Sequence, residues 1–131
     1  MDVDKLVSEA KAAFKNAYAP YSHFSVGAAI LGDNDVIYTG CNIENASYPV
    51  GICAERCAAC KAVSDGVRYF KAIVIVSSAD DLTYPCGMCR QFLAEFMDDN
   101  SKIIVNGKDQ GTLSVPFNVA FPFAFRSDDI K

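Results

Sequence analysis

The sequence has no run of lysine or arginine that could follow a phosphate backbone, and its formal net charge is −4. Nucleic-acid binding is therefore not expected, because it depends on basic side chains that neutralise phosphates. The longest apolar runs, such as residues 73–76, are far too short to cross a bilayer. The first residues are charged and lack the apolar stretch of a signal peptide. We therefore expect a cytoplasmic protein that does not enter a membrane.

Phosphate-binding loops and histidine-based catalytic groups are also scarce. Neither G-x-G-x-x-G nor G-x-x-x-x-G-K-[ST] occurs, so a loop for nucleotide phosphates is not indicated. His23 is the only histidine, and a Ser-His-Asp or Cys-His arrangement would have to use it. It lies at the entry of a predicted strand, where we expect a surface or structural role.

What the sequence does contain is the composition of one domain. Of its 131 residues, 51% are hydrophobic and 21% are charged, which is enough for a single core. Apolar residues spaced as on one helical face predict a first helix, and short apolar runs between turn residues predict strands. We expect helices at 3–17, 54–65 and 86–98, strands at 25–31, 36–41, 70–78 and 102–106, turns at 32–35 and 107–111, and a loop at 42–52.

The order of these elements predicts the architecture. The first two strands should form a hairpin, and the almost continuously apolar strand 70–78 should be central and buried on both faces. Strands alternating with helices favour a sheet covered by helices on both sides. We expect an antiparallel pair at one edge of this sheet and parallel pairing in the remainder.

Three of the six cysteines are spaced as metal ligands. Cys53 precedes one predicted helix, and Cys86 and Cys89 form a C-x-x-C after Pro85 at the start of another. Helix N-termini carry partial positive charge, which favours thiolate over thiol. Three sulfur ligands leave the fourth position of a tetrahedral zinc ion open, as in catalytic sites. Glu55 is placed to handle the proton of a water at that position.

Two other uses of the cysteines remain open. Cys57 and Cys60 form a second C-x-x-C, which could combine with Cys86 and Cys89 into a closed structural zinc site. Both lie inside a predicted helix between alanines, however, as buried cysteines often do. Three disulfides are the other possibility, but they require an oxidising compartment.

A longer pattern resembles one family. Zinc-dependent nucleoside deaminases carry H/C-x-E followed by P-C-x-x-C, which residues 53–55 and 85–89 match as C-A-E and P-C-G-M-C. Over roughly residues 5–130 the chain resembles the small homotetrameric cytidine deaminases, more than fold analogy alone would give. The similar stretches include 21–29, 42–48 and 122–125. The resemblance implies one domain, residues 1–131, with a three-layer α/β/α fold and a mixed sheet of about five strands.

The resemblance also implies roles for individual residues. Zn²⁺ would be held by Cys53, Cys86 and Cys89, Glu55 would shuttle protons, and Arg56 would donate a hydrogen bond to a ligand thiolate. The expected nucleoside contacts are Asn42 and Glu44 to the ribose, the Ala54 backbone to the pyrimidine, Phe24 as a lining aromatic, Tyr48 near the subunit junction and Phe125 from a neighbouring subunit.

One stretch departs from the family pattern. Related chains carry a short helix with a Leu-Leu pair before the terminal P-F-A-F, whereas residues 113–121 of this chain contain Pro116 instead. Proline is tolerated in a first helical turn, so a helix can still begin there. The placement of Phe125 depends on that segment.

The implied activity is zinc-dependent hydrolysis of cytidine and 2′-deoxycytidine to the uridines and ammonia in pyrimidine salvage. It would be carried out by a homotetramer with shared active sites. Glu55 would carry protons between water, the ring and the leaving amine. Glu44 suits a sugar hydroxyl and repels phosphate, which favours a nucleoside over a nucleotide. A deaminase of another amino-heterocycle and a structural zinc module remain the alternatives.

Overall fold

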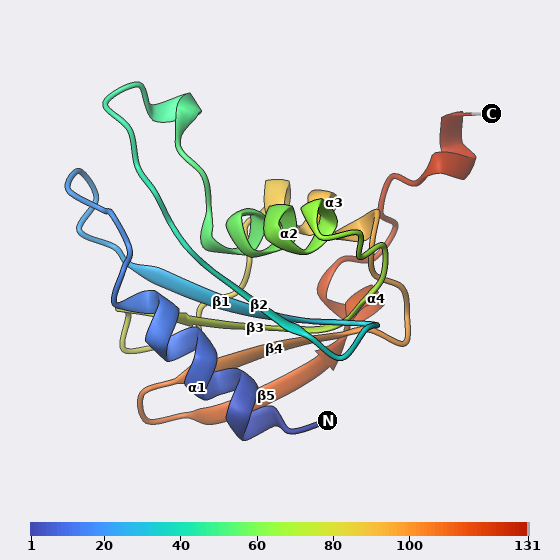
Figure 1. Cartoon of the computed structure of the whole chain (residues 1–131), viewed down its shortest axis with the longest axis horizontal. Coiled ribbons are helices and arrows are strands. Elements are labelled where there is room, and N and C mark those ends of the chain that lie inside the picture. Colours follow the sequence, from blue (N-terminus) through green and yellow to red (C-terminus); the bar gives the residue numbers. More distant parts are fainter. Residues whose placement is uncertain (131) are drawn as a thin grey trace.

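The computed structural model describes residues 1–130, in which a five-stranded mixed sheet lies between two layers of helices (Figure 1). The strand order is β2-β1-β3-β4-β5. The strands are β1 (Val26–Gly32), β2 (Ile37–Cys41), β3 (Phe70–Ser77), β4 (Lys102–Gly107) and β5 (Gly111–Pro116). The helices are α1 (Val3–Phe14), α2 (Ala54–Ser64), α3 (Gly87–Ala94) and α4 (Phe117–Ala120), with short 3₁₀ turns at Tyr48–Val50 and Ser127–Ile130.

The pairing of the strands confirms one part of the predicted topology and corrects another. β1 pairs antiparallel with both β2 and β3, so the hairpin is confirmed. The expectation of a parallel remainder is wrong, because only β3 and β4 run parallel and β5 pairs antiparallel with β4. β5 begins at Gly111, whose φ of 74° suits glycine at the end of a tight turn. The predicted turn at 107–111 therefore closes a second hairpin.

Separate apolar clusters fill the two faces of the sheet. On one face, α1 packs Leu6, Val7 and Ala10 against side chains that include Val74 and Ile104. On the other face, alanines of α2, Leu93 of α3 and Phe117 of α4 share one cluster with β1, β3 and β4. Residues 72–76 of β3 are at most 5% exposed, because helices cover both of their faces. The predicted three-layer arrangement is thus confirmed.

Tertiary pairing ends two helices earlier than their sequence patterns predict. α1 ends at Phe14 rather than at residue 17, because Tyr18 pairs with the chain around Ile43 instead of continuing the helix. α3 ends at Ala94 rather than at residue 98, and the Phe96 carbonyl then accepts the N–H of Phe70 at 2.9 Å. Long-range hydrogen bonds have replaced the local helical ones at both places.

The altered segment near the C-terminus does contain a helix. Pro116 ends β5 and is the N-cap of α4, which begins at the buried Phe117. The proline therefore lies just before the first turn rather than within it. Of the helices in residues 1–130, none is long and apolar enough to span a membrane.

Two glycines let helices approach the sheet closely from opposite sides. A Cβ atom at Gly27 would lie 2.3 Å from the Ala10 carbonyl oxygen of α1. One at Gly40 would lie 2.4 Å from the Ala58 nitrogen and 2.6 Å from the Ala54 oxygen of α2. Gly40 therefore sets how near the start of α2 lies to β2.

Candidate active site

The N-termini of α2 and α3 bring three thiols together. Cys53 is the N-cap of α2, Cys86 is the N-cap of α3, and Cys89 follows in the first turn of α3. Their sulfur atoms all lie within 4.8 Å of one another. With Zn–S bonds of about 2.3 Å, a tetrahedral zinc ion would hold sulfur ligands about 3.8 Å apart. The number, type and spacing of these donors fit zinc, and we call them the thiol cluster.

The two alternative uses of the cysteines are not found. Within residues 1–130, the thiol cluster is the one group of three or more side chains that could hold a metal ion, and it excludes Cys57 and Cys60. Cys60 is exposed, although its spacing with alanines suggested a buried side chain. All six cysteines lie in the described chain and are unpaired, so there is no disulfide framework.

The cluster favours one thiolate and resists a second. A hydrogen bond from Cys89, with further support from Arg56 and Cys86, lowers the pKa of Cys53 to about 5. The same contact raises the pKa of Cys89. Arg56 donates from Nη2 to the Cys53 sulfur across 3.8 Å, while its buried Nε finds no partner in the described residues. Further thiolates need a cation to offset their repulsion, which a divalent metal provides.

Glu55 is the buried carboxyl group of the site. It is the second residue of α2 and is 5% exposed. Burial is the main cause that raises the pKa of Glu55 to about 7, and the nearby charge of Cys53 adds to it. A carboxyl group with a pKa near neutrality can both accept and donate a proton.

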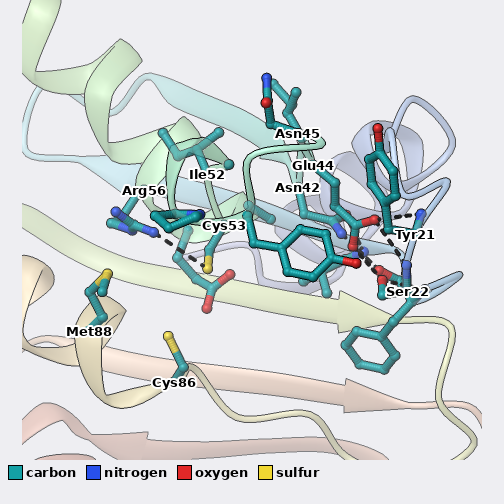
Figure 2. Close-up of a pocket in the computed structure, with 18 of the residues that line it drawn as sticks. Tyr21, Ser22, Asn42, Glu44, Asn45, Ile52, Cys53, Arg56, Cys86 and Met88 are labelled. Carbon is teal, nitrogen blue, oxygen red and sulfur yellow. Dashed lines mark hydrogen bonds between the residues drawn. The ribbon is translucent and has the colours of Figure 1, made fainter.

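A cavity of about 650 Å³ opens onto this region, a size suited to a small organic ligand. Figure 2 shows Cys53, Cys86 and Arg56 at one end, with Tyr21, Ser22 and Glu44 at the other. Most of the residues predicted to contact a substrate line the cavity, namely Phe24, Asn42, Glu44, Tyr48 and Ala54, together with Glu55 and Arg56. One cavity therefore contains both the groups predicted to carry out the reaction and those predicted to bind the sugar.

Hydrogen bonds from the chain hold the Glu44 carboxylate in place. Oε1 accepts the backbone N–H groups of Tyr21 at 3.0 Å and Ser22 at 3.1 Å, and Oε2 accepts the Ser22 hydroxyl. The Ser22 hydroxyl is the main cause of a lowered pKa at Glu44. The carboxylate is thus kept as an anion and an acceptor.

Asn42 fixes the backbone beside the cavity. Its amide donates to the Phe24 carbonyl oxygen at 2.8 Å, and its side-chain oxygen accepts the Val26 N–H at 2.8 Å. An amide group carries two donor hydrogens, so one N–H of Asn42 remains for a ligand.

Phe125 is not brought to the cavity of its own chain. Its side chain is 58% exposed, and Gln91 donates to its backbone carbonyl oxygen at 2.8 Å. The next residue, Arg126, donates from Nη1 to the Ala94 carbonyl oxygen at 2.5 Å. The expectation that Phe125 serves a neighbouring subunit stays a prediction.

Several cavity residues were not singled out from the sequence. They are Tyr21 and Ser22 before Phe24, Thr83 and Tyr84 before the C-x-x-C, and Met88 within it. The available signal was their position beside predicted site residues.

Two helices that pack on a mixed sheet bring three thiols and a buried glutamate together at their N-termini. This arrangement defines the class of zinc-dependent deaminases. Residues 1–106 match the model of the family described as the cytidine and deoxycytidylate deaminase zinc-binding region. A cytidine deaminase of Sporosarcina psychrophila is 45% identical over 131 residues, covering 100% of this chain and 96% of that protein.

Two further comparisons agree. A probable cytidine deaminase of Dictyostelium discoideum is 40% identical over 130 residues, covering 98% of this chain and 87% of that protein. The crystal structure of cytidine deaminase from Burkholderia pseudomallei superposes with a TM-score of 0.89 at 37% identity, covering 95% of this chain and 100% of that one. The chain belongs to the cytidine deaminase family. It is a hydrolytic deaminase, and zinc is its cofactor.

Proposed function

We propose that this enzyme converts cytidine and 2′-deoxycytidine to uridine and 2′-deoxyuridine with release of ammonia, in pyrimidine salvage. The observation that carries the proposal is the thiol cluster beside the buried Glu55, at one end of a cavity whose other end presents Glu44. A six-membered amino-heterocycle at the thiol end and a sugar at the Glu44 end would together fill this cavity. All six unpaired cysteines agree with a reducing, cytoplasmic location.

The reaction divides into proton transfers that one carboxyl group can perform. Zinc held by Cys53, Cys86 and Cys89 would supply a Lewis acid that lowers the pKa of water toward about 7. Glu55 accepts one proton from the attacking water and places it on ring N3, so that C4 becomes more electrophilic and the water oxygen bonds to it. Glu55 then takes the remaining proton of that oxygen and gives it to the amino group, so that the C4–N bond breaks, ammonia leaves and C4 keeps a carbonyl oxygen. Its burial excludes bulk water from both transfers.

Arg56 moderates the charge of the thiol cluster. Three thiolates carry more negative charge than a divalent ion offsets, which weakens the ion as a Lewis acid. By donating to the Cys53 sulfur, Arg56 draws charge away from that ligand. We assign it this role rather than that of a surface salt bridge, because its guanidinium contacts sulfur and its Nε is buried.

The opposite end of the cavity recognises the sugar. Glu44 and the remaining N–H of Asn42 supply an acceptor and a donor for the 3′-hydroxyl. The anionic Glu44 repels phosphate, so a nucleoside is favoured over a nucleotide. Phe24 and Tyr48 add aromatic surface beside it, and the Ala54 backbone lies where the pyrimidine would contact α2.

We further propose a homotetramer with shared active sites. Large apolar side chains are exposed near the C-terminus, with Val119 at 63%, Phe123 at 103% and Phe125 at 58%. Exposed apolar groups of this kind mark surfaces for association. Phe125 from one subunit would stack on the base bound by its neighbour.

Purified protein with measured zinc content, incubated with cytidine, tests the function. Loss of the cytidine ultraviolet band with stoichiometric release of ammonia is the expected result. A panel with deoxycytidine, deoxycytidine monophosphate, adenosine and guanine tests the substrate class. Preferred turnover of the monophosphate would replace the nucleoside proposal, and stoichiometric zinc without turnover of any substrate would favour a structural zinc module.

A further inference from the structure

We infer that Ser22 is a positioning residue that holds Glu44 in the geometry needed to read the 3′-hydroxyl of the substrate. This inference rests on the proposed function. In Figure 2 Ser22 and Glu44 face one another at the end of the cavity away from Cys86, and dashed lines join them.

The Ser22 hydroxyl connects two of the predicted substrate contacts. It donates to Oε2 of Glu44 and accepts the backbone N–H of Phe24 at 3.0 Å. A hydroxyl has one donor hydrogen and two acceptor lone pairs, so it can make both bonds at once. In such a chain each hydrogen bond polarises the next. Loss of this single oxygen would remove a donor from Glu44 and an acceptor from the Phe24 N–H.

The hydroxyl also completes the set of donors around the carboxylate. Without it, both remaining donors, the backbone N–H groups of Tyr21 and Ser22, bond to Oε1 alone. The carboxylate group could then rotate, and Oε2 could bond water. With it, three of the roughly four acceptor sites of Glu44 are occupied, which leaves about one for a ligand hydroxyl. The arrangement is therefore already set before a substrate enters.

The backbone around Ser22 is in a conformation that needs such support. His23, between Ser22 and Phe24, has a φ of 57°, in the left-handed region that non-glycine residues seldom adopt. Its N–H donates to the Ala19 carbonyl oxygen at 3.0 Å. Strained residues of this kind persist where surrounding contacts fix them. The hydrogen bond from the Phe24 N–H to the Ser22 hydroxyl spans this residue and is among those contacts.

Steady-state kinetics of Ser22→Ala with cytidine and with 3′-deoxycytidine test the inference. We expect the KM for cytidine to rise about tenfold, equivalent to about 1.4 kcal/mol and in the range for a hydrogen bond to a charged group. The kcat should stay within about twofold, because Glu55 and the thiol cluster are untouched. The KM for 3′-deoxycytidine should change by less than about twofold, since that substrate lacks the group that Glu44 reads.

Ser25→Ala is the matched control. Ser25 bonds to Ser78 through its backbone N–H rather than its own hydroxyl, and it does not line the cavity. Its kinetics should equal those of the wild type with both substrates. The pair Ser22→Thr and Ser22→Val separates the hydroxyl from the shape of the side chain, and it decides the matter if the alanine variant folds poorly. Threonine should restore the cytidine KM toward the wild-type value, and valine should not.

Each outcome has a distinct meaning. An equal rise of KM with both substrates, an unchanged cytidine KM, or equal behaviour of the threonine and valine variants would overturn the role of Ser22. A wild-type enzyme that does not deaminate cytidine would instead overturn the proposed function. A wild-type enzyme that treats both substrates alike would remove Glu44 from 3′-hydroxyl recognition, and the inference about Ser22 would end with it.

Discussion

Substituting Gly40 by alanine should damage the zinc site from outside the cavity. Gly40 lies on β2, and an added Cβ would meet the Ala58 nitrogen at 2.4 Å and the Ala54 oxygen at 2.6 Å. Both atoms belong to the backbone of α2, so no flexible side chain can move aside. Ala54 directly follows Cys53 and precedes Glu55, so any shift of the helix moves the proposed metal ligand and the proposed proton-transfer group together.

The size of the effect follows from these distances. Ordinary contact begins at 3.4 Å, so the start of α2 must move away from the sheet by about 1 Å. Overpacking of this kind typically costs about 1–3 kcal/mol, which should lower Tm by roughly 5–10 °C in a domain of this size. Zinc sites tolerate ligand displacements of only about 0.2 Å, so zinc affinity should fall at least about tenfold. Activity should fall by about 100-fold, as for other displacements of this size.

Gly27→Ala separates the loss of stability from the loss of the site. Its Cβ would lie 2.3 Å from the Ala10 oxygen, a similar overlap, but against α1 on the opposite face of the sheet. Both variants should show a lower Tm by circular dichroism. Competition with a zinc-binding dye should show weaker zinc binding only for Gly40→Ala. If that variant bound zinc as tightly as Gly27→Ala does, the reasoning that Gly40 spaces the metal site would be refuted.

Three further predictions concern the site itself. Glu55→Gln should retain zinc and bind cytidine, measured by calorimetry, while turnover drops by at least about 100-fold; near-normal turnover would remove Glu55 from proton transfer. Cys89→Ser should lose zinc, measured by atomic absorption, and Cys57→Ala should keep it; zinc loss in the second variant would restore the closed-site alternative. Phe125→Ala should have lower deaminase activity, and mixing it with the inactive Glu55→Gln chain should recover activity in sites that the two chains share. No recovery, or a fully active monomer on gel filtration, would contradict the proposal of shared active sites.

Local patterns in the sequence were sufficient for the elements that bury a regular apolar face. β3 was predicted as central because its residues are almost all apolar, and it is covered on both faces. The helices that begin after Cys53 and Cys86 were predicted from their flanking residues, and both cysteines are N-caps. The thiol cluster could be inferred because C-x-E and P-C-x-x-C restrict which thiols can meet one ion.

The errors arose where distant parts of the chain compete for backbone hydrogen bonds. The helical spacing of apolar residues continued to residue 17. In the structure, however, the backbone N–H of Tyr18 donates to the Asn42 carbonyl oxygen at 2.9 Å, and the Tyr18 carbonyl oxygen accepts the backbone N–H of Glu44 at 2.8 Å. β5 was missed as a strand because its residues are largely exposed and carry little apolar alternation. Its pairing with β4, rather than its composition, makes it a strand.

By itself, the sequence determined which atoms can hold zinc, which carboxyl group lies next to them and where helices begin, because these depend on residue type and short spacing. Only the tertiary structure decided that Ser22 reaches Glu44, that Gly40 spaces α2 from β2, and that Phe125 does not line its own cavity. Such contacts join residues far apart in the chain. Their geometry is set by how the sheet and helices pack, which no local pattern encodes.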